Sequence, residues 1–363
     1  MKFLSTIIRF LVGGLFIFSG LIKVNDPIGT AIKMEEYFEV FATNFSDIFH
    51  VFVPVALPIS IIFVVLEVVL GVALILGYKQ NITLYSILSL CIFFTFLTGY
   101  SAITNSVTDC GCFGDAIKLT PWQSFYKDIV LVVLLFVLMF LKKNIQSNKL
   151  EMVSHYIVAA STVLSFILCF WVIEHLPFID FRAYKIGNHI PTEMKPTAPY
   201  IYEYIMEKDG KEYTFAQYPT EPGYNYVAMN HLNPEAAPKI TDFAIWNEEG
   251  DLTEWAFDGN KLFVIAYSLE NSNLNHISQI ADLAKTISNE VHTSVLTASN
   301  LEEYEAFKSK QNLDLPFHYA DATVLKTIAR SNPALWLLKD GLVVGKWHHN
   351  DVPKAETILK LLN

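Results

Sequence analysis

Two cysteines stand one residue apart in the sequence TDCGCFGD, which runs from Thr108 to Asp115. A disulfide between Cys110 and Cys112 would close a very small ring, and such a bond tends to be strained and easily reduced. The pair is therefore predicted to be redox-active: one cysteine attacks a partner and the other resolves the mixed disulfide. A static disulfide that shapes the loop is the main alternative. The residues alone do not tell which cysteine attacks.

Charges near the two cysteines have opposite effects on the ionisation of their thiols. Lys118 is the nearest cation in the sequence, whereas Asp109 and Asp115 would oppose ionisation of a thiol. A metal site is disfavoured because two thiolates would need further ligands, and no nearby histidine supplies them. No metal is therefore expected, and free, inert thiols are a minor alternative.

Glu67 is a further candidate site residue, because it places a carboxylate inside an apolar run. It lies in the apolar run Val55–Gly77, with about ten apolar residues on each side. A carboxylate at such a depth in a membrane is costly and indicates function by default. It could line a pocket for a quinone-like head group. The structural alternative is one interhelical hydrogen bond, with Ser19, Thr95 or Thr98 as the candidate partner.

Four further side chains inside apolar runs are assigned structural roles. Lys127 and Asp128, near the start of a run, are predicted to be interfacial anchors rather than catalysts. Cys91 and Cys169 are predicted to be buried, apolar-like residues.

These residues are carried by runs that are long enough to cross a bilayer as helices, which takes about 20 residues. A cleaved signal peptide is a poor interpretation of the first run, because its apolar core is too long and four more spans follow. A lipid bilayer is therefore the expected surrounding. The five predicted spans are Phe3–Val24, Val55–Gly77, Leu84–Ala102, Trp122–Leu141 and Ser154–Ile173.

Basic residues in the connections predict the orientation. They precede the first span and follow the second and fourth, so they fall on one side, the cytoplasm. The loop of Cys110 and Cys112 and everything after Glu174 then lie outside, in the periplasm of a bacterium, where disulfides persist. The protein is expected in the inner membrane with a cytoplasmic N-terminus. The basic residues concerned are Lys2, Lys79, Lys142, Lys143 and Lys149.

The charge distribution separates a membrane part from a soluble part. Among 363 residues, 52% are hydrophobic and the mean hydropathy is +0.35, high for a soluble protein. Residues 1–150 contain 10 Lys and Arg against 9 Asp and Glu, whereas residues 151–363 contain 16 against 27. Nothing is basic enough to suggest nucleic-acid binding.

The C-terminal part alternates strand and helix patterns from residue 239 and ends in a hairpin and a helix, which predicts an α/β domain. His348 and His349 close that hairpin, where a solvated strand end is favoured over a metal site. The expected organisation is a four-helix transmembrane domain, a fifth transmembrane helix, a connector with a β-hairpin, and the α/β domain. Their boundaries are 1–145, 146–177, 178–238 and 239–363.

The segments PKITDFAIWNEEGD and SNPALWLLKDG resemble thioredoxin-like domains of the TlpA-like type. The resemblance implies a cis-proline at Pro333, beside a surface suited to an extended peptide of a partner. The family's Cys-x-x-Cys would fall near Ser268–Leu274, where this chain has SLENSNL. The domain is therefore expected to lack redox activity and to act in recognition or positioning.

The N-terminal part resembles the DoxX family, including its MauE-like branch, in FSGLIKVNDP, EVVLGVALILG and DCGCFGD followed by WQSFYKDIVLV. It is most similar to Bacteroidetes members with a C-terminal extension. MauE-like members are associated with disulfide maturation of periplasmic proteins, and other members with quinone oxidoreduction. The resemblance implies thiol–disulfide exchange with periplasmic thiol or disulfide proteins, with a quinone as a candidate cofactor. A non-catalytic membrane scaffold is the alternative.

Overall fold

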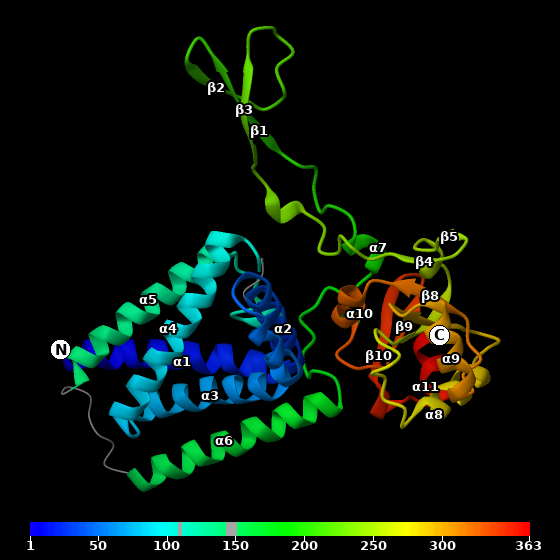
Figure 1. Ribbon diagram of the computed structural model, residues 1–363, viewed down its shortest axis with the longest axis horizontal. Coiled ribbons are helices and arrows are strands. Elements are labelled where there is room, and N and C mark those ends of the chain that lie inside the picture. Colours follow the sequence, from blue (N-terminus) through cyan, green and yellow to red (C-terminus); the bar gives the residue numbers. More distant parts are fainter. Residues whose placement is uncertain (108–110, 143–150) are drawn as a thin grey trace. The chain divides into compact units, whose positions relative to one another are not determined.

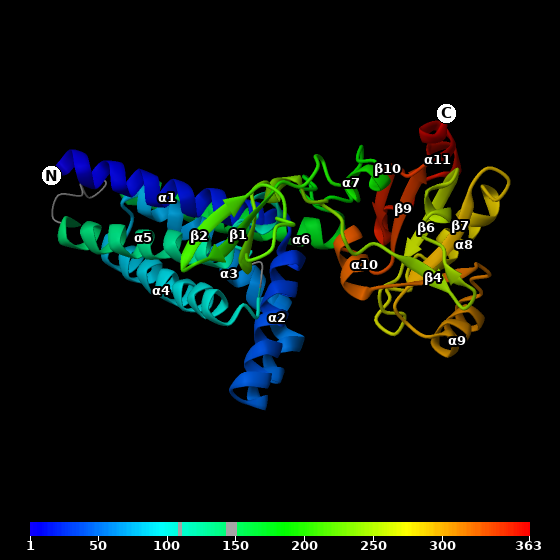
Figure 2. The ribbon, with the colours of Figure 1, turned by 90° about the horizontal axis from the view of Figure 1, so that it is seen from above.

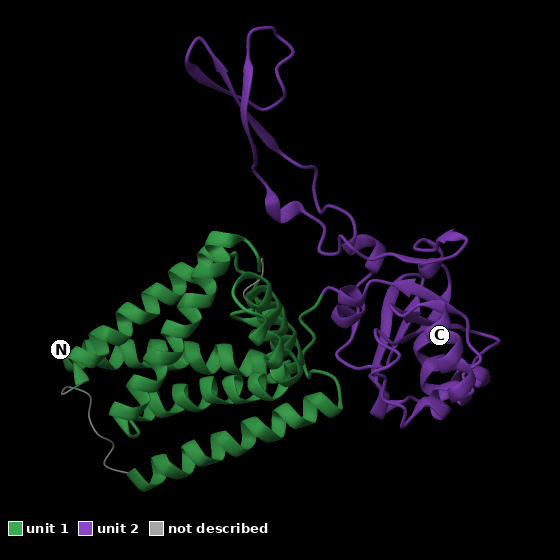
Figure 3. Cartoon of the chain, in the orientation of Figure 1, with its two compact units in different colours: residues 1–182 green, residues 183–363 purple. Residues whose placement is uncertain are grey.

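The computed structural model describes residues 1–107, 111–142 and 151–363 (Figure 1). Within them the chain forms two compact units, Met1–Arg182 and Ala183–Asn363 (Figure 3). The first unit is helical and the second contains both β-sheets. The predicted combination of a helical membrane part and an α/β domain is thereby confirmed.

Five helices in the described part of the chain are long and apolar enough to cross a membrane, as predicted. The second of these spans includes a 3₁₀ segment, Asp47–Val55, that leads into α3. Two basic residues used to predict the orientation, Lys143 and Lys149, lie outside the described residues. The five helices are α1 (Lys2–Asn25), α3 (Ala56–Leu76), α4 (Gln80–Thr104), α5 (Pro121–Phe140) and α6 (Glu151–Glu174).

The outward faces of these helices are apolar, as a lipid surrounding requires. Each helix carries a large apolar side chain that is more than half exposed. These side chains include Phe10, Ile62, Phe96, Val133 and Ile167. The inward faces of α1, α3, α4 and α5 form an apolar core that includes Val12, Leu74, Ile87 and Leu135.

Local sequence determines where the helices begin and end. At the start of α5 the Thr120 side chain accepts a hydrogen bond from the Gln123 backbone N–H. In return, the Gln123 side-chain oxygen accepts one from the Thr120 backbone N–H. Pro121 occupies the first helical position, where a missing N–H costs nothing. Helix α3 ends at Gly77, whose φ of 68° is easily adopted only by glycine.

Close packing of α1 against α3 depends on small residues. A Cβ atom on Gly71 would lie 2.8 Å from the Gly13 carbonyl oxygen, and one on Gly20 would lie 2.9 Å from the Val68 backbone nitrogen. Backbone atoms cannot move aside as a flexible side chain can, so these glycines allow the two helices to approach. Gly14 is different, since a Cβ atom added there would meet no other atom within 4 Å.

Helix α2 (Pro27–Asn44) crosses the end of the helix bundle, as the two views in Figures 1 and 2 show. Its N-terminus is capped by Asp26, which accepts a hydrogen bond from the Gly29 N–H. Tyr37 and Phe41 on its inner face are buried, and the Tyr37 hydroxyl lies 2.8 Å from the Ser101 hydroxyl on α4. The α2 helix therefore packs on the bundle end.

The second unit is built around a seven-stranded sheet with the order β10-β9-β6-β7-β8-β4-β5. Strands β6, β7 and β8 are parallel, whereas β9 is antiparallel to β6 and β10 to β9. A mixed sheet with helices beside it is the α/β domain that the sequence predicts. The strands are β4 (Ile245–Asn247), β5 (Gly250–Asp251), β6 (Asn260–Ile265), β7 (His292–Thr297), β8 (Phe317–Ala320), β9 (Ala334–Lys339) and β10 (Leu342–His348).

Five helices precede, connect or follow these strands along the described part of the chain. Strand β8 and helix α10 are additions that the sequence did not indicate, because both are short and only Asp321 separates them. Asp321 caps α10 through its side chain, which accepts from the Thr323 and Val324 N–H groups. The helices are α7 (Ile190–Glu193), α8 (Ile277–Thr286), α9 (Leu301–Gln311), α10 (Ala322–Ile328) and α11 (Ala355–Leu362).

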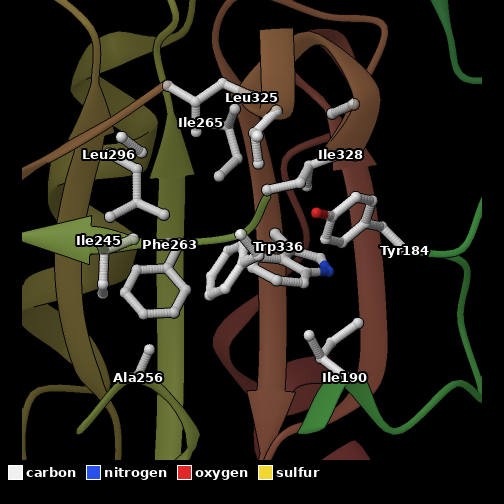
Figure 4. Packing of buried hydrophobic residues seen from close by; sticks show 14 of the residues in the cluster. Tyr184, Ile190, Ile245, Ala256, Phe263, Ile265, Leu296, Leu325, Ile328 and Trp336 are labelled. Carbon is white, nitrogen blue, oxygen red and sulfur yellow. The ribbon is translucent and has the colours of Figure 1, made fainter. Parts of the chain in front are cut away.

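The core lies on both faces of the seven-stranded sheet. Along β9, Trp336 belongs to one buried cluster, whereas Leu335 and Leu337 belong to the cluster on the opposite face. Alternate residues of a strand point to opposite faces, so a strand that is apolar throughout must be covered twice. Figure 4 shows Trp336 packed beside Phe263 and Tyr184 in the first cluster.

A second, three-stranded sheet has the order β2-β1-β3. It consists of β1 (Tyr202–Lys208), β2 (Lys211–Phe215) and β3 (Asn225–His231). The predicted Asp209-Gly210 turn joins β1 and β2, with φ values of 54° and 73°. Two successive positive φ angles are typical of the tight hairpin turn that Asp-Gly favours.

A histidine pair in the α/β unit predicts a pH-dependent stability. The Trp255 ring lies between His292 and His318, at centroid distances of 4.9 and 5.0 Å. Both nitrogens of His318 are buried without a hydrogen-bond partner. Burial lowers the pKa of His318, and His292 lowers it further; burial and Lys261 lower the pKa of His292.

The folded protein therefore binds protons less readily than the unfolded chain. Stability should be complete above the unfolded histidine pKa of about 6.5 and fall as the pH drops below it, by at most about 1.4 kcal/mol per pH unit for the buried His318. The exposed His292 should contribute less, because solvent screens its charge. Thermal unfolding of the full-length protein in nanodiscs between pH 7.5 and 5 measures this slope. His318→Phe should flatten it; an unchanged slope in that variant would contradict the assignment.

Candidate functional site

Cys112 lies in the loop between α4 and α5 and is partly exposed, whereas Cys91 and Cys169 are buried inside helices as predicted. Cys110 and Asp109 lie outside the described residues, so the predicted pairing of Cys110 with Cys112 stays a prediction. The loop returns to the bundle at Gly111, whose φ of 63° favours glycine. The backbone carbonyl of Cys112 is held by the Ser19 hydroxyl at 2.9 Å.

Ser19 links this loop to the intramembrane carboxylate. Its hydroxyl lies 3.0 Å from Glu67 Oε2, and the Lys23 ammonium lies 2.6 Å from Glu67 Oε1. Glu67 and Lys23 are only 3% and 8% exposed. Both carboxylate oxygens of Glu67 are thus engaged by α1.

Of the three partners considered for Glu67, the structure selects Ser19. Thr95 donates to the Cys91 carbonyl at 2.7 Å instead, and Thr98 lies beside Asp128. Lys23 was not anticipated, because a lysine in the last turn of an apolar helix is also typical of an interfacial anchor. Its place four residues after Ser19, on the same helix face, is the signal that could have revealed it.

A second ion pair lies on α5, beside Cys112. The Lys127 ammonium is 2.8 Å from Asp128 Oδ1, and the Thr98 hydroxyl donates to Asp128 Oδ2 at 3.0 Å. The Lys127 ammonium also lies 5.3 Å from the centre of the ring of Phe113, the residue after Cys112. Asp128 is 3% exposed, so its carboxylate faces the interior of the helix bundle, whereas the role of the two residues as interfacial anchors stays a prediction.

The two ion pairs and Cys112 form one polar cluster inside an apolar bundle. Its members come from α1, α3, α4, α5 and the loop before α5, which are distant in sequence and close in space. Burying two ion pairs has a large desolvation cost, and replacing them with apolar residues is often neutral or stabilising. Their presence beside a reactive residue type therefore points to function rather than to stability.

The other predicted site residue, Pro333, follows a cis peptide bond from Asn332. The Asn332 side chain donates to the Ser268 carbonyl at 2.7 Å, and the Asn332 carbonyl accepts from the Asn273 N–H at 2.8 Å. The cysteine-free segment Ser268–Leu274 is therefore bonded to the residue before Pro333.

His348 and His349 are 3% and 7% exposed, so the prediction of a solvated strand end is wrong. His349 Nδ1 lies 2.9 Å from the buried Ser331 hydroxyl, and the two histidine rings pack at a centroid distance of 4.0 Å. The hairpin end is covered by the segment that precedes β9, which the sequence pattern of the hairpin alone could not indicate. Among the described residues no cluster of three or more potential metal ligands occurs.

Five membrane-spanning helices, a buried polar cluster beside a loop cysteine, and an α/β unit define a membrane protein with an appended α/β domain. Residues 1–141 match the family model described as methylamine utilisation protein MauE. The first 141 residues of the chain are therefore similar to this family, and the match ends just after helix α5.

A curated relative extends the comparison beyond the single family model. Protein TlpB of Flavobacterium psychrophilum is 30% identical over 174 residues, which cover 47% of this chain and 44% of that protein. The chain thus matches less than half the length of this relative. No solved structure matches the chain significantly.

Proposed function

We propose that this protein carries out thiol–disulfide exchange with periplasmic or membrane-bound partners through Cys110 and Cys112. The observation that carries the proposal is the place of Cys112, a partly exposed loop thiol whose backbone carbonyl the Ser19 hydroxyl holds at 2.9 Å, beside the buried Lys23–Glu67 ion pair. Thiol–disulfide exchange needs a sulfur that a partner can reach. Cys91 and Cys169, which are buried in the bundle, lack this access.

The proposed location is the inner membrane, with a cytoplasmic N-terminus and a periplasmic α/β domain. The distribution of basic residues between the spans supports this orientation. It places Cys110 and Cys112 in an oxidising compartment, where a disulfide can persist. Reporter fusions after residues 146 and 185 should report cytoplasm and periplasm, respectively.

A quinone is not included in this proposal. Lys23 and Ser19 lie within hydrogen-bonding distance of the two Glu67 oxygens, and the proposed exchange needs no further group at that carboxylate. A quinone cofactor stays a prediction from the sequence resemblance. The proposed exchange takes place between a dithiol in one protein and a disulfide in the other, so that one is oxidised as the other is reduced.

The α/β domain is proposed to recognise or position the partner. The segment where its family carries redox cysteines, Ser268–Leu274, has none, so the domain itself cannot exchange thiols at that place. The surface beside Pro333 is the proposed contact for an extended peptide. Because Asn273 occupies the Asn332 carbonyl, a peptide that binds that backbone group must displace this hydrogen bond.

The decisive experiment replaces Cys110 and Cys112 singly with serine in the full-length protein, expressed in its native host. At least one variant should accumulate a mixed disulfide with a partner, detected on non-reducing gels and identified by mass spectrometry. Cys91→Ser is the matched control and should capture nothing. If neither variant captures a partner and the double variant behaves like the wild type in cells, the protein is a scaffold with a structural cysteine pair.

A further inference from the structure

We infer that the outer edge of strand β3 binds an extended, positively charged segment of a partner protein, which pairs with β3 as a fourth strand of the three-stranded sheet. Addition of a strand to an open sheet edge is a recurrent way of recognising an extended peptide. This edge belongs neither to the cysteine loop nor to the segment beside Pro333. The inference therefore goes beyond the proposed thiol exchange and does not depend on it.

The two outer strands of this sheet differ in how they are protected. Strand β2 has five residues and carries Lys211 and Glu212. Strand β3 has seven residues, NYVAMNH, without Lys, Arg, Asp, Glu or Pro. Short strands, charged side chains and prolines are the features that keep a sheet edge from pairing with another chain. By these criteria the β2 edge is protected and the β3 edge is open.

The backbone of β3 directs hydrogen-bonding groups toward the open edge. Beside the strand, the Leu232 N–H donates to the Ile201 carbonyl at 2.8 Å. Hydrogen-bonded and non-hydrogen-bonded residue pairs alternate along an antiparallel ladder. His231 and Met229 are therefore the residues of β3 whose N–H and C=O groups face away from β1. An added strand would accept and donate the hydrogen bonds that these groups offer.

One face of the sheet beside this edge is aromatic and exposed. Tyr226 and Met229 of β3 have exposed fractions of 56% and 47%. Behind them, the Tyr202 ring lies 5.1 Å from the His231 ring and 6.4 Å from the Tyr204 ring, measured between ring centres. Every second side chain of an added strand lies on this face, so apolar side chains there would cover the exposed groups.

The opposite face of the sheet carries carboxylates. Glu207 of β1 lies directly across from Glu212 of β2, and like charges in that arrangement are unfavourable. Glu203 lies on the same side of β1 and accepts a hydrogen bond from the Asn230 amide at 3.3 Å. Among the residues that the structure describes, no basic side chain forms an ion pair with these three glutamates. This face therefore favours a cationic neighbour.

Charge decides between a partner segment and a second copy of the chain. Residues 200–232 contain five Asp and Glu against two Lys, a net charge of −3 with histidine neutral. A second copy would bring the same negative charge, whereas a segment with lysine or arginine is attracted. Strands in a sheet lie about 5 Å apart, so a long basic side chain on the added strand extends past the small Ala228 toward Glu203 and Glu207. The segment that fits alternates apolar and basic residues.

The first test uses the full-length protein in nanodiscs of zwitterionic lipid and a fluorescein-labelled peptide of alternating valine and lysine, about as long as β3. Fluorescence anisotropy should rise as the peptide binds. The same peptide with every backbone amide N-methylated should bind more weakly by about tenfold or more, because it cannot donate hydrogen bonds to β3. Equal binding of the two peptides, or no binding of the unmodified one, would overturn the inference.

Two variants then place the peptide on β3. Met229→Pro removes an N–H that faces the open edge, so the ladder between β3 and β1 keeps its bonds, and peptide binding should weaken by about tenfold. Glu203→Gln combined with Glu207→Gln leaves every backbone group in place and should weaken binding by roughly threefold to tenfold. Glu302→Gln combined with Glu305→Gln on α9 removes the same charge elsewhere and should leave binding unchanged.

Each remaining outcome contradicts the inference in a recognisable way. Wild-type binding by Met229→Pro would show that the peptide lies elsewhere, for example beside Pro333. Wild-type binding by the Glu203 and Glu207 double variant would exclude the charge selection, even if the proline variant disturbs the sheet. Mass photometry without peptide checks the other occupant: a dimer that Met229→Pro separates would show that β3 pairs with a second copy instead.

Discussion

Replacing Glu67 with glutamine is expected to destabilise the membrane unit by about 3–5 kcal/mol, the cost of leaving one member of a buried ion pair without its counter-charge. The Lys23 ammonium would remain 8% exposed, with the Glu67 carboxylate at 2.6 Å replaced by a neutral amide. Unfolding of the full-length protein in mixed micelles by increasing amounts of a denaturing detergent measures the loss.

The double replacement Lys23→Met with Glu67→Leu should cost much less than Glu67→Gln alone, because it removes both charges and leaves apolar groups of similar size. Glu36→Gln is the matched control. Its pair with Lys33 is about one-third exposed on each side, so its loss should cost about 1 kcal/mol or less. Equal losses for Glu67→Gln and Glu36→Gln would show that the Lys23–Glu67 pair is not buried as described.

Trp336→Ala is expected to destabilise the α/β unit by about 3–5 kcal/mol, since it leaves a large cavity in a closely packed core. The Trp336 side chain is fully buried, and its ring lies 5.9 Å from the ring centres of both Phe243 and Phe263. These aromatic neighbours are held by the sheet and cannot move far into the space. The effect is measured by thermal unfolding of the full-length protein, with protease resistance of the α/β unit as the signal.

Trp246→Ala is the comparison variant in the same sheet. Trp246 is 41% exposed and stacks on Tyr319 at 6.2 Å, so its removal should cost about 1 kcal/mol. A small loss for Trp336→Ala would contradict the two-sided core, whereas equally large losses in both variants would indicate that Trp246 is covered by a partner.

Features that depend on neighbouring residues were predictable. The Asp209-Gly210 and Asp340-Gly341 turns occur where the sequence predicts them, because their positive φ angles suit these residue types. Thr120 and Pro121 begin α5 because capping depends on residues within one helical turn. The five spans follow from apolar length alone.

The burial of residues whose surroundings come from distant segments was not predictable. His348 and His349 are buried because the segment around Ser331 covers them, and Asp128 is buried because Thr98 on α4 faces it. Strand β8 was missed because four residues carry too weak a pattern, and its place in the sheet comes from pairing with β7 and β4. The pattern of neighbouring residues in the sequence does not reveal contacts with distant segments.

The sequence by itself determined the chemistry available to this protein: a cysteine pair, a carboxylate deep in an apolar span, and an α/β domain without cysteines near Pro333. Only the tertiary structure decided that Lys23 and Ser19 bind Glu67 and that Thr98 binds Asp128. The reason is physical. Residue type and spacing act over a turn of helix or a hairpin, whereas an ion pair between helices exists only once close packing has brought their side chains within hydrogen-bonding distance.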